Sequence, residues 1–257
     1  MKIAMVISTP FPPEEGIGYY AYNLSKKLIE KGHEVTIFTR GSFRTRYKFY
    51  EGINVVEVPF FPLYPFHVNL HGFIFKRLFK SKESDFDLVH IHTPLTPTLN
   101  TSLPVVSTIH GSMVENVKAM EAVDFKSIGS KLMLKIITIP LITELISNSK
   151  VVTTVSKSVG AELKDNYCLD RLKIIGNGVD VEKFIPSLNQ EGYLLYVGRL
   201  SYGKGLNDLL ESAMQICKQY DLKLFIVGKG ELEKSLKNLV KSENLEKYVK
   251  FLGRIEQ

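Results

Sequence analysis

The residues that decide the fold are 3–18, which read IAMVISTPFPPEEGIG. The first five are apolar without alternation, which is typical of a strand buried on both faces of a parallel sheet. From Ile17 onward, apolar residues recur at helical spacing, and Gly32 supplies a stop. The stretch therefore predicts a strand that runs through a proline-rich turn into a helix.

The same alternation of strand and helix continues along the chain. Further strands are predicted at Val35–Phe38, Ile53–Val58, Asp87–Ile91, Val105–Ile109, Val151–Val155 and Lys173–Ile175. A long segment with apolar residues at helical spacing, Phe125–Ile146, predicts a helix. This alternation favours an α/β fold, with a mostly parallel sheet covered on both faces by helices.

The pattern restarts in the last third of the chain. Strands are predicted at Leu194–Val197, Leu224–Val227 and Val249–Leu252, and helices at Leu206–Cys217 and Glu231–Lys241. The polar segment Pro186–Gly192 separates the two halves, so we predict domains at residues 1–185 and 186–257. The second domain has only three predicted strands, and we expect a sheet of that size to expose an apolar edge and face.

Composition limits the function only loosely. The 257 residues carry a net charge of +6, which suits anionic partners such as phosphates or acidic lipid without selecting one. Cys168 and Cys217 show no metal-ligand spacing, which favours a reduced cytoplasmic setting. We find neither a signal peptide nor a run of about 20 apolar residues that could span a bilayer.

The proline-rich turn is the first candidate binding site. Its prolines hold the loop extended, and Gly16 and Gly18 allow a ligand to approach the backbone. The start of the following helix offers unpaired N–H groups to a phosphate or hydroxyl group. A plain strand-to-helix turn is the alternative. The glycine spacing matches neither the dinucleotide fingerprint nor a Walker loop, which argues against a dehydrogenase and an NTPase.

A second glycine turn follows the strand Leu194–Val197. It carries Arg199 and, five residues later, Lys204, just before a helix. The alternative is two solvated surface charges. However, open α/β sheets bind ligands outside the carboxyl ends of their strands. Arginine can contact two phosphate oxygens and lysine adds a compact charge, so the pattern favours a diphosphate site.

Three histidines fall near the ends of two predicted strands. His90 and His92 alternate along one strand, so their side chains project the same way, and packing is the better interpretation for both. No cysteine or carboxylate at ligand spacing supports a zinc site. His110 follows the next strand, where a neutral imidazole can hydrogen-bond a hydroxyl group of a bound ligand.

The segment Phe60–Phe79 is rich in aromatic residues and is accompanied by Lys76, Arg77, Lys80 and Lys82. Two interpretations are open. The segment either packs its apolar face on the sheet, which we favour, or contacts an anionic membrane surface.

Short motifs spread over the whole chain resemble those of the GT-B retaining glycosyltransferases of glycosyltransferase family 4, and they occur in that family's order. The matching stretches are Pro12–Gly18, Lys31–Val35, Leu88–His92, Thr108–Gly111, Asn177–Asp180, Val197–Leu200 with Lys204-Gly205, Val227–Gly230 and Phe251–Arg254. Each motif is loose alone, but together they are specific. The resemblance implies two Rossmann-like domains, the second incomplete, with the active site between them.

The resemblance also implies roles for individual residues. Arg199 and Lys204 would bind the donor diphosphate in place of a metal ion, and the Gly16 backbone would contact a donor phosphate. His110 would touch the transferred sugar. Gly228 and Ile255 would lie near the donor nucleotide and its base, and Gly18 and Asn177 would have supporting places in the site. No cofactor is implied beyond the nucleotide-diphosphate sugar itself.

The implied reaction moves a hexose to an acceptor hydroxyl with retention and without a metal. The acceptor would be a sugar or a lipid-linked group, with peripheral contact at the cytoplasmic membrane face and no nucleic-acid partner. Such transfer passes through an oxocarbenium-like state, and fixed cations stabilise the departing diphosphate.

The chain departs from the family pattern in three places. Glu15 stands where many members have glycine, and Thr93–Leu103 is too short for the usual helix. The family's downstream Glu-x7-Glu region is absent, so we expect this chain alone to transfer poorly or not at all. A non-catalytic partner subunit that binds a nucleotide sugar is therefore the alternative function. A Rossmann oxidoreductase is disfavoured, because Phe38-Thr39-Arg40 replaces an acidic end of the second strand.

Overall fold

The computed structural model describes residues 1–63, 67–93, 99–111, 114, 117, 128–129, 131–132, 134–167, 169, 171–186, 192–201 and 204–255. They form two compact units, Met1–Val179 and Asp180–Gln257. The predicted division at 185/186 falls a few residues inside the second unit. Each unit is an α/β structure with its own sheet, as the sequence predicts.

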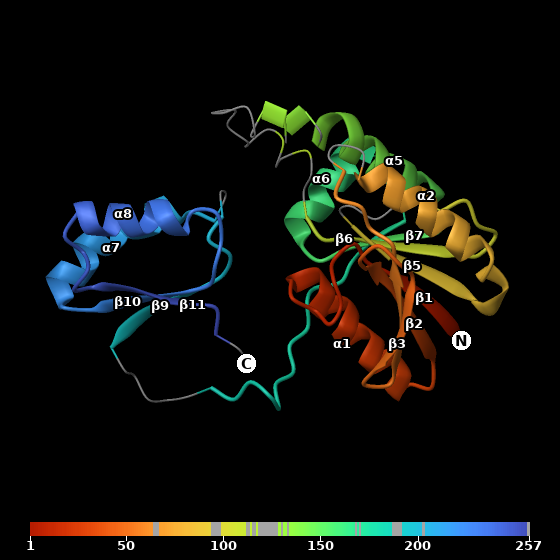
Figure 1. The fold of residues 1–257 in the computed structure, drawn as a ribbon, viewed down its shortest axis with the longest axis horizontal. Coiled ribbons are helices and arrows are strands. Elements are labelled where there is room, and N and C mark those ends of the chain that lie inside the picture. Colours follow the sequence, from red (N-terminus) through yellow and green to blue (C-terminus); the bar gives the residue numbers. More distant parts are fainter. Residues whose placement is uncertain are drawn as a thin grey trace. The chain divides into compact units, whose positions relative to one another are not determined.

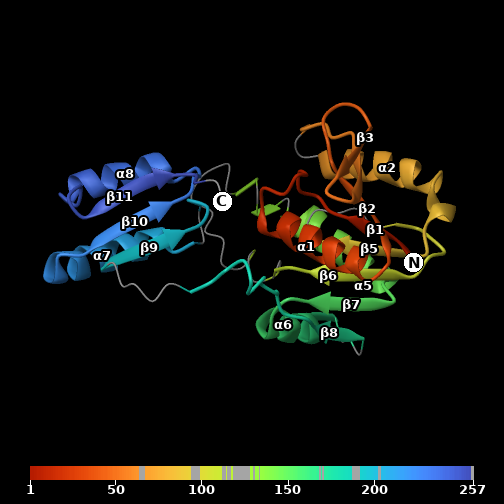
Figure 2. The same cartoon turned by 90° about the horizontal axis from the view of Figure 1, so that it is seen from below.

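The sheet of the first unit has eight strands in the order β3-β4-β2-β1-β5-β6-β7-β8. All neighbours are parallel except β3, which runs antiparallel to β4. Figure 2 shows β5, β6, β7 and β8 in succession. The strands are β1 (Lys2–Val6), β2 (Glu34–Arg40), β3 (Arg46–Tyr50), β4 (Ile53–Val58), β5 (Leu88–His92), β6 (Val105–Ile109), β7 (Val151–Thr154) and β8 (Leu172–Ile174).

Helices cover both faces of this sheet. They are α1 (Gly16–Glu30), α2 (His67–Lys80), the 3-10 turn η1 (Glu83–Asp85), the π-helical turn η2 (Leu134–Thr138), α5 (Ile139–Asn148) and α6 (Lys157–Tyr167). Met5 of β1 faces the cluster that includes Ala21 of α1, whereas Val6 faces the cluster of Phe75 and Leu145, from α2 and α5. Figure 1 shows α1 on one side of the sheet and α2 with α5 on the other. The uninterrupted apolar run of β1 thus reflects burial on both faces.

Some predicted elements differ from the structure. The edge strand β3 was not predicted, because its sequence Arg-Tyr-Lys-Phe-Tyr places charged residues in a strand that is largely exposed. The predicted helix Phe125–Ile146 corresponds to η2 and α5 from Leu134 onward, and its first residues lie outside the described part of the chain. Residues 67–79 of the segment Phe60–Phe79 belong to α2, which buries Phe75 and Phe79 against the sheet, so the packing interpretation is confirmed for them; residues 64–66 lie outside the described part of the chain.

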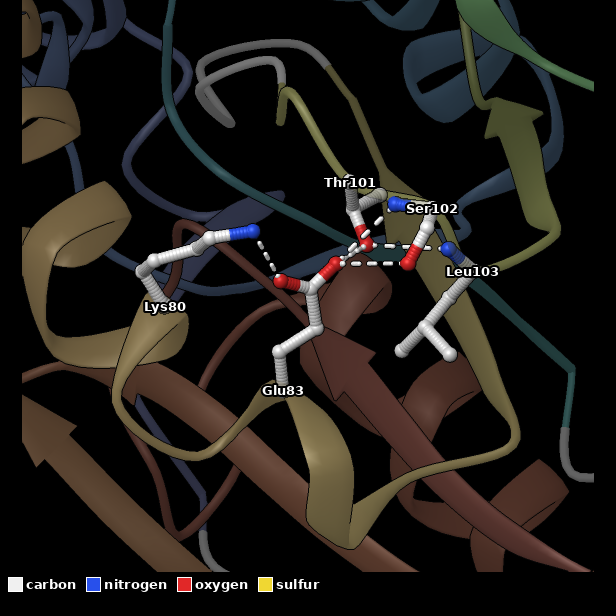
Figure 3. Close-up of polar contacts among 5 residues, drawn as sticks. All are labelled: Lys80, Glu83, Thr101, Ser102 and Leu103. Carbon is white, nitrogen blue, oxygen red and sulfur yellow. Dashed lines mark hydrogen bonds and ion pairs between the residues drawn. The ribbon is translucent and has the colours of Figure 1, made fainter.

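A single carboxylate, that of Glu83, ties the loop before β6 to the end of α2 (Figure 3). It accepts hydrogen bonds from the Lys80 ammonium, the Thr101 hydroxyl and the Ser102 backbone N–H, the last at 3.0 Å. These donors hold the pKa of the Glu83 carboxyl at about 2, the Lys80 hydrogen bond contributing most. The Thr101 hydroxyl oxygen also accepts from the Leu103 N–H at 3.1 Å, which shapes the entry into β6.

The sheet of the second unit has three parallel strands in the order β11-β10-β9. The elements are β9 (Tyr193–Val197), α7 (Leu206–Tyr220), β10 (Lys223–Val227), α8 (Glu233–Ser242) and β11 (Val249–Gly253). Both helices lie on the same face of the sheet (Figure 1), where Leu210, Leu236 and Ile226 form a buried core. The side chains of Leu195 and Val197 are 55% and 70% exposed, so the predicted bare apolar face is confirmed.

Candidate functional site

The turn after β1 is fixed in place by aromatic packing and one buried hydroxyl. Phe11 is buried and lies edge-on to the Tyr50 ring, with 5.4 Å between centroids. The Thr39 hydroxyl donates to the Thr9 carbonyl. The Thr9 hydroxyl oxygen itself is buried and has no hydrogen-bond partner among the described residues. The turn therefore holds an unsatisfied polar atom beside the start of α1.

The two glycines of this turn differ in how closely their surroundings pack against them. A Cβ atom on Gly18 would come within 3.1 Å of the Pro13 Cβ and 3.2 Å of the Thr9 hydroxyl oxygen, so Gly18 serves close packing of the helix on the loop. Gly16 is exposed and has open space around it. The first helical hydrogen bond runs from the Tyr19 N–H to the Glu15 carbonyl, at 3.0 Å. The N–H groups of residues 16 to 18 therefore lack a partner within the helix and remain available to an anion.

His110 lies at the carboxyl end of β6, in contact with the same helix. Its imidazole Nε2 is 3.0 Å from Nδ1 of His92, the last residue of β5. The ring of Tyr20, one turn into α1, lies edge-on to His110 with centroids 4.9 Å apart. The His110 backbone N–H also approaches the Thr93 hydroxyl at 3.4 Å. The structure thus brings His110 and the glycine turn to one corner of the first unit.

A second buried polar chain runs beside this corner. Nε2 of His90 is 2.7 Å from the Thr108 hydroxyl, which is 2.7 Å from the Thr153 hydroxyl. The Thr153 hydroxyl donates onward to the Ser107 carbonyl at 3.3 Å. The rings of His90 and His92 contact each other at a tilt of 31°, with centroids 4.2 Å apart, which agrees with the packing interpretation of both residues.

Burial keeps these histidines neutral. Desolvation lowers the pKa of His90 to about 4, with the His110 charge as a smaller cause, and it lowers the pKa of His110 to about 4. Desolvation also lowers the pKa of His92 well below its usual range, assisted by the two neighbouring imidazoles. At neutral pH, His110 is therefore an uncharged hydrogen-bonding group.

The turn after β9 carries the two cations, Arg199 and Lys204, that we predicted as a diphosphate site. Arg199 and Lys204 are exposed, and neither forms an ion pair with a residue in the described part of the second unit. The Tyr196 hydroxyl donates to the Arg199 carbonyl at 3.0 Å, which braces the turn. Gly205 has φ of 65° at the start of α7, a left-handed conformation that glycine adopts without strain.

The turn after β10 packs directly on the turn after β9. The N–H of Gly198 donates to the Val227 carbonyl and the N–H of Leu200 to the Lys229 carbonyl, both at 3.0 Å. A Cβ atom on Gly228 would lie 1.9 Å from the Gly198 carbonyl oxygen, so only glycine fits there. This contact explains why glycine is required at position 228. It also places the Gly228 turn beside Arg199.

The remaining predicted residues lie apart from these groups. Asn177 is exposed and follows β8, near the end of the first unit. Ile255 is exposed and follows β11. Sequence reasoning missed Tyr20, Thr9 and the contact from His92 to His110. Alternation along the strand indicates that His90 and His92 share one face of the sheet, but no sequence pattern pairs Tyr20 or His92 with His110.

The described residues contain neither a cluster of metal-ligating side chains nor a helix that could span a membrane. No group of three or more histidine, cysteine, aspartate or glutamate side chains could hold a metal ion. Likewise, no described helix has the length and apolar character required to cross a bilayer.

Comparison with known families identifies both parts of the chain. Residues 15–183 match the model of Glycosyltransferase Family 4, and residues 180–257 match that of Glycosyl transferases group 1.

Relatives and solved structures are similar over the full length of the chain. An uncharacterized glycosyltransferase of Methanocaldococcus jannaschii is 27% identical over 98% of this chain and 69% of its own length. A phosphatidyl-myo-inositol mannosyltransferase of Mycolicibacterium smegmatis is 26% identical over 100% of this chain and 65% of its own. The crystal structure of Anabaena HepE in complex with UDP and glucose superposes with a TM-score of 0.66, at 16% identity, over 100% of this chain and 70% of that chain. The present chain thus spans about two thirds of the length of these proteins.

The two α/β units and their matches define a glycosyltransferase of the GT-B fold. The chain belongs to Glycosyltransferase Family 4.

Proposed function

We propose that this protein transfers a hexose from a nucleotide-diphosphate sugar to an acceptor hydroxyl, with retention of configuration and without a metal ion. The observation that carries the proposal is the pair of exposed cations, Arg199 and Lys204, at one strand-to-helix turn of the second unit. Neither is neutralised by a described carboxylate of that unit. A diphosphate supplies the missing negative charge.

The cations would act on the leaving group. As the bond from sugar to diphosphate breaks, negative charge grows on the diphosphate oxygens and positive charge grows on the sugar. A guanidinium and an ammonium held by the protein stabilise that charge more in the transition state than in the ground state. They would thereby take the part that a divalent cation plays in other transferases.

The first unit would contribute the remaining donor contacts. The N–H groups at the start of α1 are suited to a phosphate oxygen, and the neutral His110 imidazole is suited to a sugar hydroxyl. Gly228 and Ile255 would lie near the nucleotide of the donor. Gly18 and Asn177 would belong to the same site without a direct role in the transfer. Retention is proposed from the family resemblance.

The first test removes both cations. We expect Arg199→Ala combined with Lys204→Ala to weaken binding of a nucleotide sugar by about 100-fold or more, since each charged hydrogen bond contributes roughly 1.5–3 kcal/mol. Isothermal titration with a panel of nucleotide sugars measures the affinity. Transfer by the same 257-residue chain is assayed in parallel, with and without EDTA, and proton NMR of the product gives its anomeric configuration.

The matched control removes two lysines from the opposite edge of the same sheet. Lys218 lies in the last turn of α7 and Lys223 at the start of β10, and both are exposed. Lys218→Ala with Lys223→Ala changes the net charge equally and is expected to leave affinity within about twofold, because surface charges away from the ligand contribute little. Unchanged affinity after loss of Arg199 and Lys204 would refute the proposal.

We further propose that the acceptor is lipid-linked and that the first unit contacts a membrane surface to reach it. The paired loops 41–45 and 59–63 support this contact. The Gly41 N–H donates to the Val58 carbonyl and the Phe60 N–H to the Ser42 carbonyl, both at 2.8 Å. Phe43 and Leu63 on these loops are 67% and 60% exposed. Arg44 is exposed beside them, so apolar and cationic groups share one short surface.

Sedimentation with vesicles tests this contact. We expect Phe43→Ser with Leu63→Ser to lower partitioning onto phosphatidylglycerol vesicles about tenfold or more, because each side chain loses roughly 1.5–3 kcal/mol of apolar burial. Tyr220→Ser, at a similarly exposed aromatic residue of the second unit, is the control. Equal partitioning of all three proteins, or binding only to neutral phosphatidylcholine vesicles, would contradict the contact.

A further inference from the structure

The contacts of His92 determine which of its ring nitrogens carries the proton. Nε2 of His92 is 2.8 Å from the Met5 sulfur, in the centre of the sheet, and Nδ1 is 3.0 Å from His110 Nε2. A thioether sulfur has no hydrogen to donate and can only accept. The proton must therefore lie on His92 Nε2, because the other tautomer would set a nitrogen lone pair against the sulfur lone pairs.

The same argument carries over to His110. His92 is fully buried, and desolvation lowers its pKa well below the usual range, so it is neutral and has one N–H only. With Nε2 protonated, His92 Nδ1 can only accept. The hydrogen between the two rings therefore belongs to Nε2 of His110, which is also neutral at pH 7 because burial lowers its pKa to about 4. What remains on His110 is an unprotonated Nδ1, to which no described residue donates a hydrogen bond.

We propose that His92 is a positioning residue: held by the Met5 sulfur, it fixes His110 in the Nε2–H tautomer. The Nδ1 lone pair then accepts a hydrogen bond from a hydroxyl of the transferred sugar. The assignment of that hydroxyl rests on the proposed function, whereas the tautomer rests on the contacts of His92 together with the burial that keeps both rings neutral. It makes His110 an acceptor that recognises an O–H, and it distinguishes a sugar hydroxyl from an ether or carbonyl oxygen at the same position.

The hydrogen bonds that begin at His90 form a separate series, which runs through Thr108 and Thr153 to Ser107 and does not include His110. The Ser107 carbonyl at its end can only accept, so the Thr153 hydroxyl donates to it and accepts from Thr108. The Thr108 hydroxyl then accepts from His90 Nε2. His90 therefore supplies a matched control, because it is an imidazole on the same strand that touches the His92 ring but hydrogen-bonds to the Thr108 hydroxyl rather than to Met5 or His110.

The experiment is a long-range proton–nitrogen correlation spectrum of the full chain labelled with ¹⁵N-histidine, recorded at pH 7 without ligand. The chain has six histidines, which single His→Gln variants assign. We expect His92 and His110 each to show a single Nε2–H tautomer. A protonated Nδ1 on His110, or a mixture of tautomers in the wild-type chain, would overturn the proposal.

Two substitutions separate positioning from simple packing. His92→Phe keeps a ring but removes the acceptor, and we expect His110 to change from one tautomer to a mixture. His92→Gln retains an acceptor and a donor, so the single His110 tautomer should persist, as it should in His90→Gln. A His110 spectrum that is unchanged in His92→Phe would refute the role of His92. Because no ligand is present, this result is independent of whether Arg199 and Lys204 bind a nucleotide sugar.

Discussion

At the scale of single residues, the notable feature is a set of neutral imidazoles, one fully buried and two half-buried, at the ends of β5 and β6. His90, His92 and His110 form successive ring contacts of 4.2 and 5.3 Å between centroids. Because these histidines stay neutral in the folded protein, the folded state loses stability relative to the unfolded state once the pH is low enough to protonate histidine in the unfolded chain. The corner that we propose for sugar binding is therefore also a pH-sensitive part of the first unit.

We predict that the free energy of unfolding falls as the pH drops from 7 to 5. The folded pKa values lie below the ordinary value of 6.5, so between those values the unfolded chain binds more protons and acid favours unfolding. Each such group contributes a slope approaching about 1.4 kcal/mol per pH unit. His92→Gln should therefore flatten the pH dependence measured by urea denaturation, and curves that stay parallel would contradict this explanation.

Sequence alone predicted part of this corner. The position of His110 after a strand indicated a place at the sheet edge, and the structure puts it there. The partners of His110 were not predictable, because they come from β5 and α1 and depend on the strand register. Tyr20 could not be recognised without knowing that α1 begins at Gly16 and crosses the end of β6.

At the scale of elements, short turns determine how the strands and helices are joined. Glu83 links η1 to residues 101–103, and the loop therefore enters β6 in one defined arrangement. This link could not be predicted, because a carboxylate followed eighteen residues later by threonine is not a recognisable sequence pattern. By contrast, the glycines at 198, 205 and 228 did indicate turns, since they permit close backbone contact or left-handed conformations.

We predict that Glu83→Gln destabilises the protein by roughly 1–3 kcal/mol at pH 7, the range expected when hydrogen bonds to a charged group are lost. Because the folded pKa is about 2 and therefore below the ordinary 4.5, this stabilisation is present above pH 4.5 and disappears as the pH falls toward 2. Denaturant melts of the two proteins at several pH values measure the difference.

The control for Glu83 is another acidic residue of the same unit. Glu30 pairs with Lys27 on the surface of α1, and its side chain is 55% exposed. Glu30→Gln should change stability by no more than about 0.5 kcal/mol, because exposed ion pairs are weak. If Glu83→Gln behaved like Glu30→Gln, the loop would not depend on this carboxylate.

At the scale of the whole molecule, the two units have separate cores. Every buried apolar cluster among the described residues lies entirely within one unit. The alternation of strands and helices was enough to predict both sheets and their parallel direction. It did not predict the antiparallel edge strand β3, whose charged and aromatic residues do not follow the pattern of a buried strand.

We predict that damage to the second core stays local. Leu210 is 1% exposed in that core, and Leu210→Ala should cost about 2–5 kcal/mol. Hydrogen exchange of the β10 amides should accelerate accordingly. All six histidines lie in the first unit, so their ring signals report on that unit alone and should not change. Loss of the dispersed histidine signals together with β10 protection would show that the units unfold as one.

The strand order of the larger sheet also bears on how the chain acquires its structure. β1 is synthesised before the other strands of this sheet, and it occupies an interior position between β2 and β5. On one side the sheet then grows outward through β2 and β4, and on the other through β5, β6, β7 and β8 in chain order. On that second side, each emerging strand finds its neighbour already synthesised and adds to an open margin. Assembly there can follow translation without any earlier pairing having to be undone.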